Sequence, residues 1–300
     1  MSVKLFSAVK KYSHPRASLS FYLCLLLGHH LSVSMSTGSV AKLLLVDLSG
    51  TLHVGNLATR GAVEALDWVR SRGVAVKFLT NTTKESKRDI YERLVKIGFK
   101  VDMSDILTSV SVAIDEVKRR GLKPLLITED SVEREFNEFY PELKNGDRDS
   151  VVVGLVPDKF NYTVLNEAFR LLKSNQNAPI IAIHKGKYYQ TEDGLSLGPG
   201  PFVVALEFAS GREATICGKP NQNIFLQALG QYAPEEAIMF GDDVTDDIQG
   251  AQRAGIRGCL VRTGKYRPGD ENKIEPAPAF VFENFAEAVR GIFNKTGIAS

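Results

Sequence analysis

Cysteine is scarce in this sequence, with three in 300 residues: Cys24, Cys217 and Cys259. So few and so widely spaced, they exclude a disulfide framework and a cysteine-based zinc site. Cys217 and Cys259 lie in apolar runs, where a cysteine behaves as a small hydrophobic side chain. This use of cysteine favours a reducing compartment.

A strong charge of either sign is also missing, because 37 basic residues against 35 acidic ones leave a net charge of +2. No cluster of Lys and Arg stands out in the part that is expected to fold, so we expect neither nucleic acid nor a membrane as a partner. The composition, 44% hydrophobic and 24% charged, is that of an ordinary globular protein. A chain of 300 residues can form one large domain or two smaller ones.

Acidic residues are absent from the first 46 positions. Basic residues there precede an apolar stretch at 19–28, LSFYLCLLLG, which is shorter than the roughly 20 residues needed to cross a bilayer. The composition suits an organelle presequence, and the order of basic and then apolar residues suits a secretory signal. Alternatively, residues 1–34 precede an in-frame start at Met35. We expect residues 1–40 to be a targeting segment or disordered, and the protein to be cytoplasmic, with mitochondrial import as the alternative.

From Lys42 onward, short apolar runs alternate with helical patterns. Strands are expected at 42–47 and 74–81, and helices at 60–73, 82–99 and 104–120. The second of these helices is expected to begin with Thr82 and Glu85 as a capping box. Such alternation predicts a parallel sheet with helices on both faces, in which ligands bind beyond the carboxyl ends of the strands.

The middle of the chain has strands of its own, PLLIT, VVVGL, PIIAI and KYYQT, and a helix around YTVLNEAFRLLK. A Gly/Pro cluster at 197–202 then indicates a boundary. Helices at 201–210, 222–230 and 246–254 follow, with strands at 213–217, 236–243 and 256–264 and a last strand and helix after Pro278. We therefore expect an α/β fold: a Rossmann-like core of residues 41–121 and 199–300, with a smaller α/β domain of residues 122–198 inserted.

The first strand ends on a carboxylate, in the run Asp47-Leu48-Ser49-Gly50-Thr51. A carboxylate at a strand end, beside a glycine loop, can attack a phosphoryl group and form an aspartyl-phosphate. An Asp in this place is equally typical of a turn cap. The other strand ends decide between the two interpretations.

Two further strand ends carry groups that suit a phosphate. Thr80 and Asn81 offer a hydroxyl and an amide just before a helix N-terminus, whose free N–H groups favour anions. Lys219, between a glycine and a proline, offers a point charge for a phosphoryl group or for the attacking carboxylate. Taken singly, a plain helix start and an ordinary loop lysine are the commoner cases.

Acids gather in the run GDDVTDD, which contains Asp242, Asp243, Asp246 and Asp247. A helix start favours one or two acids, but four in six residues repel one another, and a cation relieves the repulsion. Hard oxygen ligands favour Mg²⁺. A nucleophile, phosphate-binding groups, a lysine and metal carboxylates thus occur at four strand ends, and phosphoryl transfer needs little beyond positioning and charge neutralisation.

This set of residues resembles the four motifs of the haloacid dehalogenase (HAD) superfamily of phosphotransferases, and the likeness extends from residue 41 to the C-terminus. The inserted domain is similar to the larger, α/β type of cap. The resemblance implies a Mg²⁺-dependent phosphatase with Asp47 as nucleophile and Lys219 bridging it to the phosphate. It implies metal binding by Asp47, the backbone carbonyl of Ser49, Asp242 and Asp247, and substrate binding by Asp47, Leu48, Ser49, Thr80, Asn81 and Lys219.

The sequence departs from the family pattern at Ser49, where most members have the Asp that protonates the leaving group and activates water. Serine is a poor acid and base near neutral pH, and general acid–base catalysis contributes about 10²–10⁴-fold. We therefore expect substrates with good leaving groups, such as pyrophosphate, acyl phosphates or phosphoramidates. Alternatively His53 transfers the proton, or the protein turns over little and binds a phosphate ligand or a protein partner.

The inserted domain is expected to set specificity by closing over the site. Its basic residues His184, Lys185 and Lys187 can bind an anionic substrate, although basic residues in such a place more commonly form a solvated strand edge that discourages pairing. Gly198, Pro199 and Gly200 are expected to form a hinge. The expected partners are a small phosphorylated substrate and, through the cap, a second copy of the chain.

Two other functions are disfavoured. No G-x-G-x-x-G follows the first strand, as a dinucleotide-binding site would require. The acid cluster suits a metal and a phosphate better than it suits the dehalogenase branch of the superfamily.

Overall fold

The computed structural model describes residues 41–83, 85–141, 147–191 and 194–295. The expectations for residues 1–40 and for Met35 lie outside this part, and the compartment stays a prediction. None of the helices in the described ranges is both long and apolar enough to cross a membrane.

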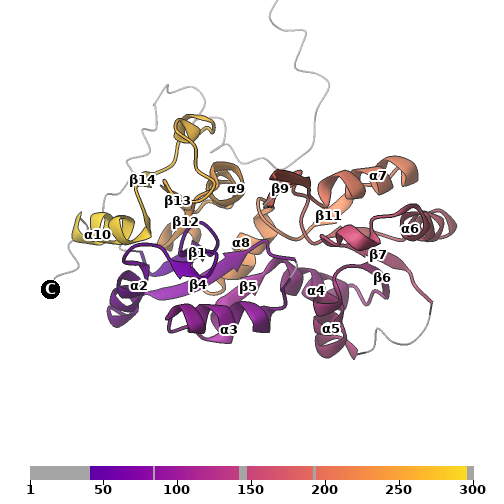
Figure 1. Cartoon of the computed structure of the whole chain (residues 1–300), viewed down its shortest axis with the longest axis horizontal. Coiled ribbons are helices and arrows are strands. Elements are labelled where there is room, and N and C mark those ends of the chain that lie inside the picture. Colours follow the sequence, from indigo (N-terminus) through magenta and orange to yellow (C-terminus); the bar gives the residue numbers. More distant parts are fainter. Residues whose placement is uncertain (1–40, 84, 142–146, 192–193, 296–300) are drawn as a thin grey trace, which may run out of the picture. The chain divides into compact units, whose positions relative to one another are not determined.

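The main sheet has six parallel strands in the order β14-β13-β12-β1-β4-β5 (Figure 1). Their bounds are β1 (Leu43–Asp47), β4 (Ala75–Thr80), β5 (Ile106–Thr108), β12 (Ala237–Gly241), β13 (Arg257–Val261) and β14 (Phe280–Phe282). The chain leaves β1 toward β4 and β5 on one side and returns to β12, β13 and β14 on the other. β1 is therefore the point where the strand order reverses, and such a point is where ligands bind in open α/β sheets.

Alternate side chains of β1 belong to two different hydrophobic cores. Leu44 and Val46 pack with α2, α3 and α10, whereas Leu43 and Leu45 pack with α4, α8 and α9. The bounds are α2 (Ala62–Ser71), α3 (Lys87–Ile97), α4 (Ser109–Arg119), α8 (Gln222–Leu229), α9 (Gly250–Arg253) and α10 (Phe285–Lys295). The two cores confirm the Rossmann-like core with helices on both faces of its sheet.

A second parallel sheet, in the order β11-β8-β7-β6, forms the smaller α/β unit. The elements of this unit are β6 (Pro124–Ile127), α5 (Asp130–Phe139), β7 (Ser150–Val153), α6 (Tyr162–Ser174), β8 (Ile180–Ala182), the hairpin β9 (Tyr188–Thr191) and β10 (Gly194–Leu197), α7 (Gly200–Ser210) and β11 (Ala214–Ile216). A hydrophobic cluster of its own joins β7 and β8 to α6 and α7. The expected inserted α/β domain is confirmed as a feature of the fold.

The second sheet continues past residue 198, where we expected the core to resume. β11 pairs in parallel with β8, and Val203 and Leu206 of α7 are buried in the small unit's cluster. The Gly/Pro cluster does not end the unit, because Gly200 is the first residue of α7. The expected end at 198 is thus too early for this sheet, and we place the end near residue 217; the other boundaries stay predictions.

Two predicted helices differ from the structure in their bounds or type. The region expected as one helix at 104–120 holds a 3₁₀ turn, Met103–Asp105, then β5, and α4 begins only at Ser109. The helix expected at 246–254 begins as a π-helical segment, Val244–Gln249, and becomes α9. Short elements that we had not distinguished are α5, the hairpin of β2 (His53–Val54) and β3 (Leu57–Ala58), and 3₁₀ turns at Pro157–Lys159, Pro234–Glu236 and Asp270–Asn272.

The capping box of α3 is formed by Ser86 and Asp89, not by Thr82 and Glu85. The segment before it is not helical because its side chains bind elsewhere. The Thr83 hydroxyl accepts the Leu155 N–H at 3.3 Å, and Glu85 pairs with Arg93 on α3 at 2.6 Å. The sequence suggested that α3 begins directly after Asn81, but the helix begins only at Lys87.

Candidate active site

Asp47 is the last residue of the central strand and is 7% exposed. The chain turns sharply after it, because the Leu48 carbonyl accepts the N–H groups of Leu52 and His53 at 2.9 and 3.2 Å. Gly50 has a φ of +93°, and a Cβ there would overlap the carboxylate of Asp242. The glycine is thus required both by the turn and by the close approach of the two acids.

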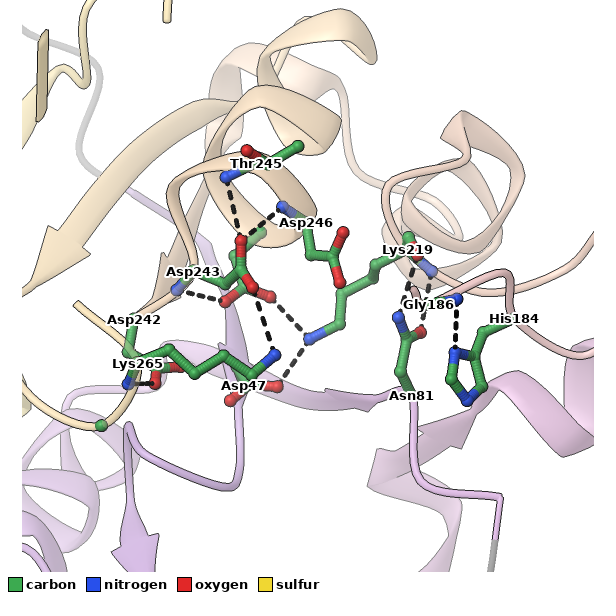
Figure 2. A network of polar contacts seen from close by, with 12 residues as sticks. Asp47, Asn81, His184, Gly186, Lys219, Asp242, Asp243, Thr245, Asp246 and Lys265 are labelled. Atoms are coloured by element: carbon green, nitrogen blue, oxygen red, sulfur yellow. Dashed lines mark hydrogen bonds and ion pairs between the residues drawn. The ribbon is translucent and has the colours of Figure 1, made fainter. Parts of the chain in front are cut away.

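Lys219 is the buried cation of the site. Its Nζ lies 2.5 Å from Asp47 Oδ1 (Figure 2). It also lies 2.6 Å from Asp247 Oδ1 and donates to the Leu79 carbonyl at 3.3 Å. Burial alone would lower the pKa of this amine, but the charges of Asp247 and Asp47 outweigh it and hold the pKa above its ordinary value. Lys219 is therefore charged at any physiological pH.

Asp47, Asp242 and Asp247 bring carboxylate oxygens within 4.8 Å of one another. Burial, followed by the charge of Asp47, raises the pKa of Asp242 to about 7. Burial also holds the pKa of Asp247 well above its ordinary range, although Lys219 opposes the shift. The raised pKa values show that these carboxyl groups repel one another when ionised, and a bound divalent cation would offset this repulsion.

The donor set fits Mg²⁺, because these ligands are all hard oxygens. The surrounding backbone also leaves room around Asp242. A Cβ on Gly264, as on Gly50, would overlap its Oδ2 atom, and the Lys265 N–H donates to that oxygen at 2.6 Å. The Asp242 carboxylate is thus held in a cradle of glycine backbone, oriented by one N–H group.

The other two acids of the run have different surroundings. Asp243 caps the π-helical segment, because its carboxylate accepts the N–H groups of Thr245 and Asp246 at 3.0 and 2.9 Å. Burial, with the charge of Asp243, raises the pKa of Asp246 to about 6. The helix-start interpretation of this run therefore holds for Asp243.

Thr80 and Asn81 lie at the end of β4, beside the same centre. Thr80 is 4% exposed, and its hydroxyl accepts the Thr82 N–H at 3.2 Å. The Asn81 side chain accepts the Lys219 N–H at 2.8 Å and donates to the Lys219 carbonyl at 2.9 Å. The amide expected to bind phosphate thus positions the backbone of Lys219, and its contact with phosphate stays a prediction.

Three sequence candidates in the loop after β1 differ in exposure. The Leu48 side chain is buried in the core, so only its backbone can face a ligand, whereas Ser49 is exposed. His53 is 2% exposed rather than a surface residue, and its Nδ1 lies 2.8 Å from the Gly55 carbonyl. Burial, followed by Arg93, lowers the pKa of His53. Its role as an alternative acid stays a prediction, because no hydrogen bond joins it to the acid cluster among the described residues.

The three basic residues of the small unit that were expected to bind an anionic substrate have different surroundings. Lys185 pairs with Glu207 of α7 at 2.6 Å, so its charge is already neutralised. Lys187 is exposed. His184 is half-buried, and Figure 2 shows its ring beside Asn81.

Sequence analysis missed Lys265, which follows β13. Its Nζ pairs with Asp243 at 3.1 Å, while its backbone N–H binds Asp242. Burial alone would lower the pKa of Lys265, but the negative charges around it, those of Asp243 and Asp247 first, have the larger effect together. The pKa therefore lies above its ordinary value. The only available signal was Gly264, a glycine just beyond a strand end.

The fold is a Rossmann-like sheet, and a carboxylate, a lysine and further acids lie close together at the carboxyl end of its central strand. The family described as haloacid dehalogenase-like hydrolase matches residues 44–140, and one described as HAD-hydrolase-like matches residues 216–288. The chain belongs to the haloacid dehalogenase-like hydrolases and is an enzyme of their phosphatase type.

Its relatives cover nearly the whole of the described chain. It is 49% identical to haloacid dehalogenase-like hydrolase domain-containing protein 2 of Bos taurus, over 85% of this chain and 97% of that protein. It is 38% identical to the phospholysine phosphohistidine inorganic pyrophosphate phosphatase of Bos taurus, over 82% of this chain and 92% of that protein.

A solved structure is similar as well. Glycerol phosphate phosphatase of Mycobacterium tuberculosis, in complex with magnesium, is 28% identical and superposes with a TM-score of 0.71, covering 83% of this chain and 77% of that one.

Proposed function

We propose that this enzyme is a Mg²⁺-dependent phosphohydrolase that forms an aspartyl-phosphate on Asp47. Its substrates are small phosphorylated compounds with good leaving groups, such as pyrophosphate or phosphoramidates. One observation carries the proposal: the buried Nζ of Lys219 bridges Asp47 and Asp247, with Asp242 in the same cluster. A carboxylate, an ammonium and two further acids at one strand edge suit phosphoryl transfer, which depends on positioning and charge neutralisation.

The chemistry follows from these positions. An Asp47 oxygen bonds to phosphorus while the bond to the leaving group breaks, and the leaving group keeps the electron pair. Water then attacks the same phosphorus, the bond to Asp47 breaks, and free phosphate is released. Lys219 supplies positive charge beside Asp47 throughout, because its pKa is held above the ordinary value.

Asp47, Asp242 and the Ser49 carbonyl would hold the metal, with Asp247 close by. When bound, Mg²⁺ supplies positive charge for the phosphoryl oxygens. The similar magnesium complex from Mycobacterium tuberculosis supports this choice of ion.

Ser49 supports the choice of substrate. The hydroxyl cannot protonate a basic alkoxide, so compounds that release a weakly basic group are favoured. One relative is named phospholysine phosphohistidine inorganic pyrophosphate phosphatase, which refers to phosphorus–nitrogen and phosphoanhydride bonds. A phosphoanhydride releases phosphate, and a phosphoramidate nitrogen can take a proton from solvent before the bond breaks and then leaves as a neutral amine, so neither bond requires an acid at the position of Ser49.

The test is phosphate release from pyrophosphate, a phosphoramidate and p-nitrophenyl phosphate, with Mg²⁺ and with EDTA. We expect turnover that EDTA abolishes and that Asp47→Asn lowers by at least about 10³-fold, since it removes the nucleophile. Asp115→Asn is the control, because Asp115 accepts a hydrogen bond from Gln227 of α8 and, within the described ranges, forms no hydrogen bond or ion pair with a residue of the site. Asp47→Asn with the wild-type rate would refute the proposal.

Ser49 also favours a second candidate, a weakly active protein that binds a phosphate ligand or a protein partner. Ser49→Asp separates the two, since it restores the missing acid. A rise of about 10²-fold or more in the hydrolysis of an alkyl phosphate such as glycerol phosphate, whose leaving group needs a proton, identifies an intact catalytic site. No rise, together with wild-type phosphate binding, favours the binding protein.

We also propose a homodimer through the small unit. Large apolar side chains are exposed there on α7 and on the β9–β10 hairpin: Tyr188, Leu195, Leu197, Val204 and Phe208. Phe208 is 90% exposed, which is unusual for a side chain of its size.

A further inference from the structure

The loop of residues 183–187, which follows β8, is held by glycine backbone. The Gly198 N–H donates to the Lys187 carbonyl at 3.0 Å, and the Gly200 N–H donates to the Gly186 carbonyl at 2.9 Å. A Cβ on either glycine would collide with the Gly186 carbonyl. The Gly/Pro cluster thus holds the backbone of this loop through two hydrogen bonds, and its expected role as a hinge stays a prediction.

The anchored loop fixes the tautomer of His184. The Gly186 N–H donates to His184 Nδ1 at 3.1 Å, so the neutral ring carries its proton on Nε2. Burial lowers the pKa of His184 to about 4, with a smaller contribution from the charge of Lys265. The ring is thus neutral at physiological pH, and no hydrogen bond occupies Nε2 among the described residues.

His184 lies at the edge of the active site. Gly218 packs between Asn81 and the loop of residues 183–187. A Cβ on Gly218 would collide with Asn81 Oδ1 and the Ile183 carbonyl oxygen and would contact His184 Cβ, so these groups lie close to one another. Asn81 in turn binds the backbone of Lys219. Figure 2 shows the imidazole beside Asn81, on the side away from Asp47. When Asp47 attacks a phosphorus atom in line, the leaving group departs from the opposite side of that phosphorus.

We propose that His184 is a specificity-determining residue whose Nε2–H donates a hydrogen bond to an anionic oxygen of the leaving group. The inference rests on the proposed function. Such a bond strengthens as negative charge develops on the departing group. A neutral imidazole does not give up this proton, so His184 selects leaving groups that are already weak bases, in agreement with Ser49. It distinguishes a leaving phosphate, rich in anionic oxygens, from a nitrophenolate, whose single oxygen has delocalised charge.

The test compares kcat and KM for pyrophosphate and p-nitrophenyl phosphate in His184→Leu and His184→Gln. Removing a hydrogen bond to a charged group should lower kcat/KM for pyrophosphate by about 10- to 100-fold in His184→Leu. For p-nitrophenyl phosphate we expect less than about a threefold change from the same variant, because its leaving group gains little from the bond. Gln places an amide N–H near the position of Nε2 and should restore most of the pyrophosphate activity.

Lys173→Met is the control, since Lys173 is an exposed residue on α6 of the same small unit. Melting temperatures of all variants show that the fold is kept. Equal losses on both substrates, no loss, or identical behaviour of the Gln and Leu variants would overturn the role of His184. A wild-type protein that hydrolyses neither substrate would instead overturn the proposed function.

Discussion

Replacing Lys219 by methionine removes the buried cation and keeps much of its volume. The wild-type Nζ lies 2.5 and 2.6 Å from two carboxylates, and its side chain is 4% exposed. Breaking a buried ion pair from one side costs about 3–5 kcal/mol, because the partner charges stay buried and unpaired. In a folded body of this size, 1 kcal/mol corresponds to about 2–4 °C, so Lys219→Met should melt at least about 6 °C below wild type.

The loss should depend on pH. Lys219 opposes the burial that raises the pKa of Asp247, so its removal raises this pKa further. A carboxyl whose pKa is raised on folding stabilises the protein below its ordinary pKa, and this contribution is lost as the pH rises through the folded value. The deficit of Lys219→Met should therefore be largest near pH 8 and shrink toward pH 4.

Urea denaturation at pH 8 and at the lowest pH where both proteins fold measures the effect. Lys77→Met is the control: it also loses an ion pair, with Asp105 at 3.1 Å, but that lysine is 36% exposed. Such exposed pairs contribute about 0–1 kcal/mol. A Lys219→Met deficit that matches the control, or that stays constant with pH, would show that the buried charges do not interact as described.

Three further predictions concern the metal cradle, a buried acid and the exposed patch. Gly264→Ala should abolish stabilisation by Mg²⁺ in thermal-shift titrations, because the new Cβ would overlap the Asp242 carboxylate. The control is Gly269→Ala, which also has a positive φ but open space around the Cβ; it should lose only about 1–2 kcal/mol of stability and keep the Mg²⁺ response. Burial raises the pKa of Glu135, so Glu135→Gln should be more stable than wild type at pH 8 in urea denaturation, with the gap closing toward pH 4.5; a less stable variant at pH 8 contradicts this. Phe208→Glu should halve the mass found by light scattering, while Tyr162→Glu, 82% exposed on α6, should not, and a monomeric wild type would exclude the dimer.

The central part of the site was predictable because it depends on local sequence. Four apolar residues before Asp47 make a strand that is buried on both faces, and a strand of this kind places its last residue at the carboxyl edge of the sheet. The same logic located Asp242 just after β12, whereas Lys219 follows β11, a strand of the second sheet, so its position beside Asp47 does not follow from this rule. Parallel strands bring their ends together, so residues far apart in sequence meet without any contact being known.

Contacts between distant segments were not predictable in this way. The pattern of β11 shows that it is a strand, but not that it pairs with β8 in the second sheet rather than with the core. Two successive capping patterns, Thr82–Glu85 and Ser86–Asp89, occur at the start of α3, and the binding of Thr83 to Leu155 favours the later one. Lys265 reaches Asp242 through its backbone N–H, which leaves no trace in the side-chain sequence.

The place of Lys219 in the chain has a mechanical consequence. β11 belongs to the second sheet and ends at Ile216, so a displacement of that sheet would pull on the backbone three residues before the ammonium. Two hydrogen bonds between the Asn81 side chain and the Lys219 backbone hold this segment beside the end of β4, a strand of the main sheet. A displacement of the second sheet would therefore have to break these two bonds before it changed the distance between Lys219 and Asp47.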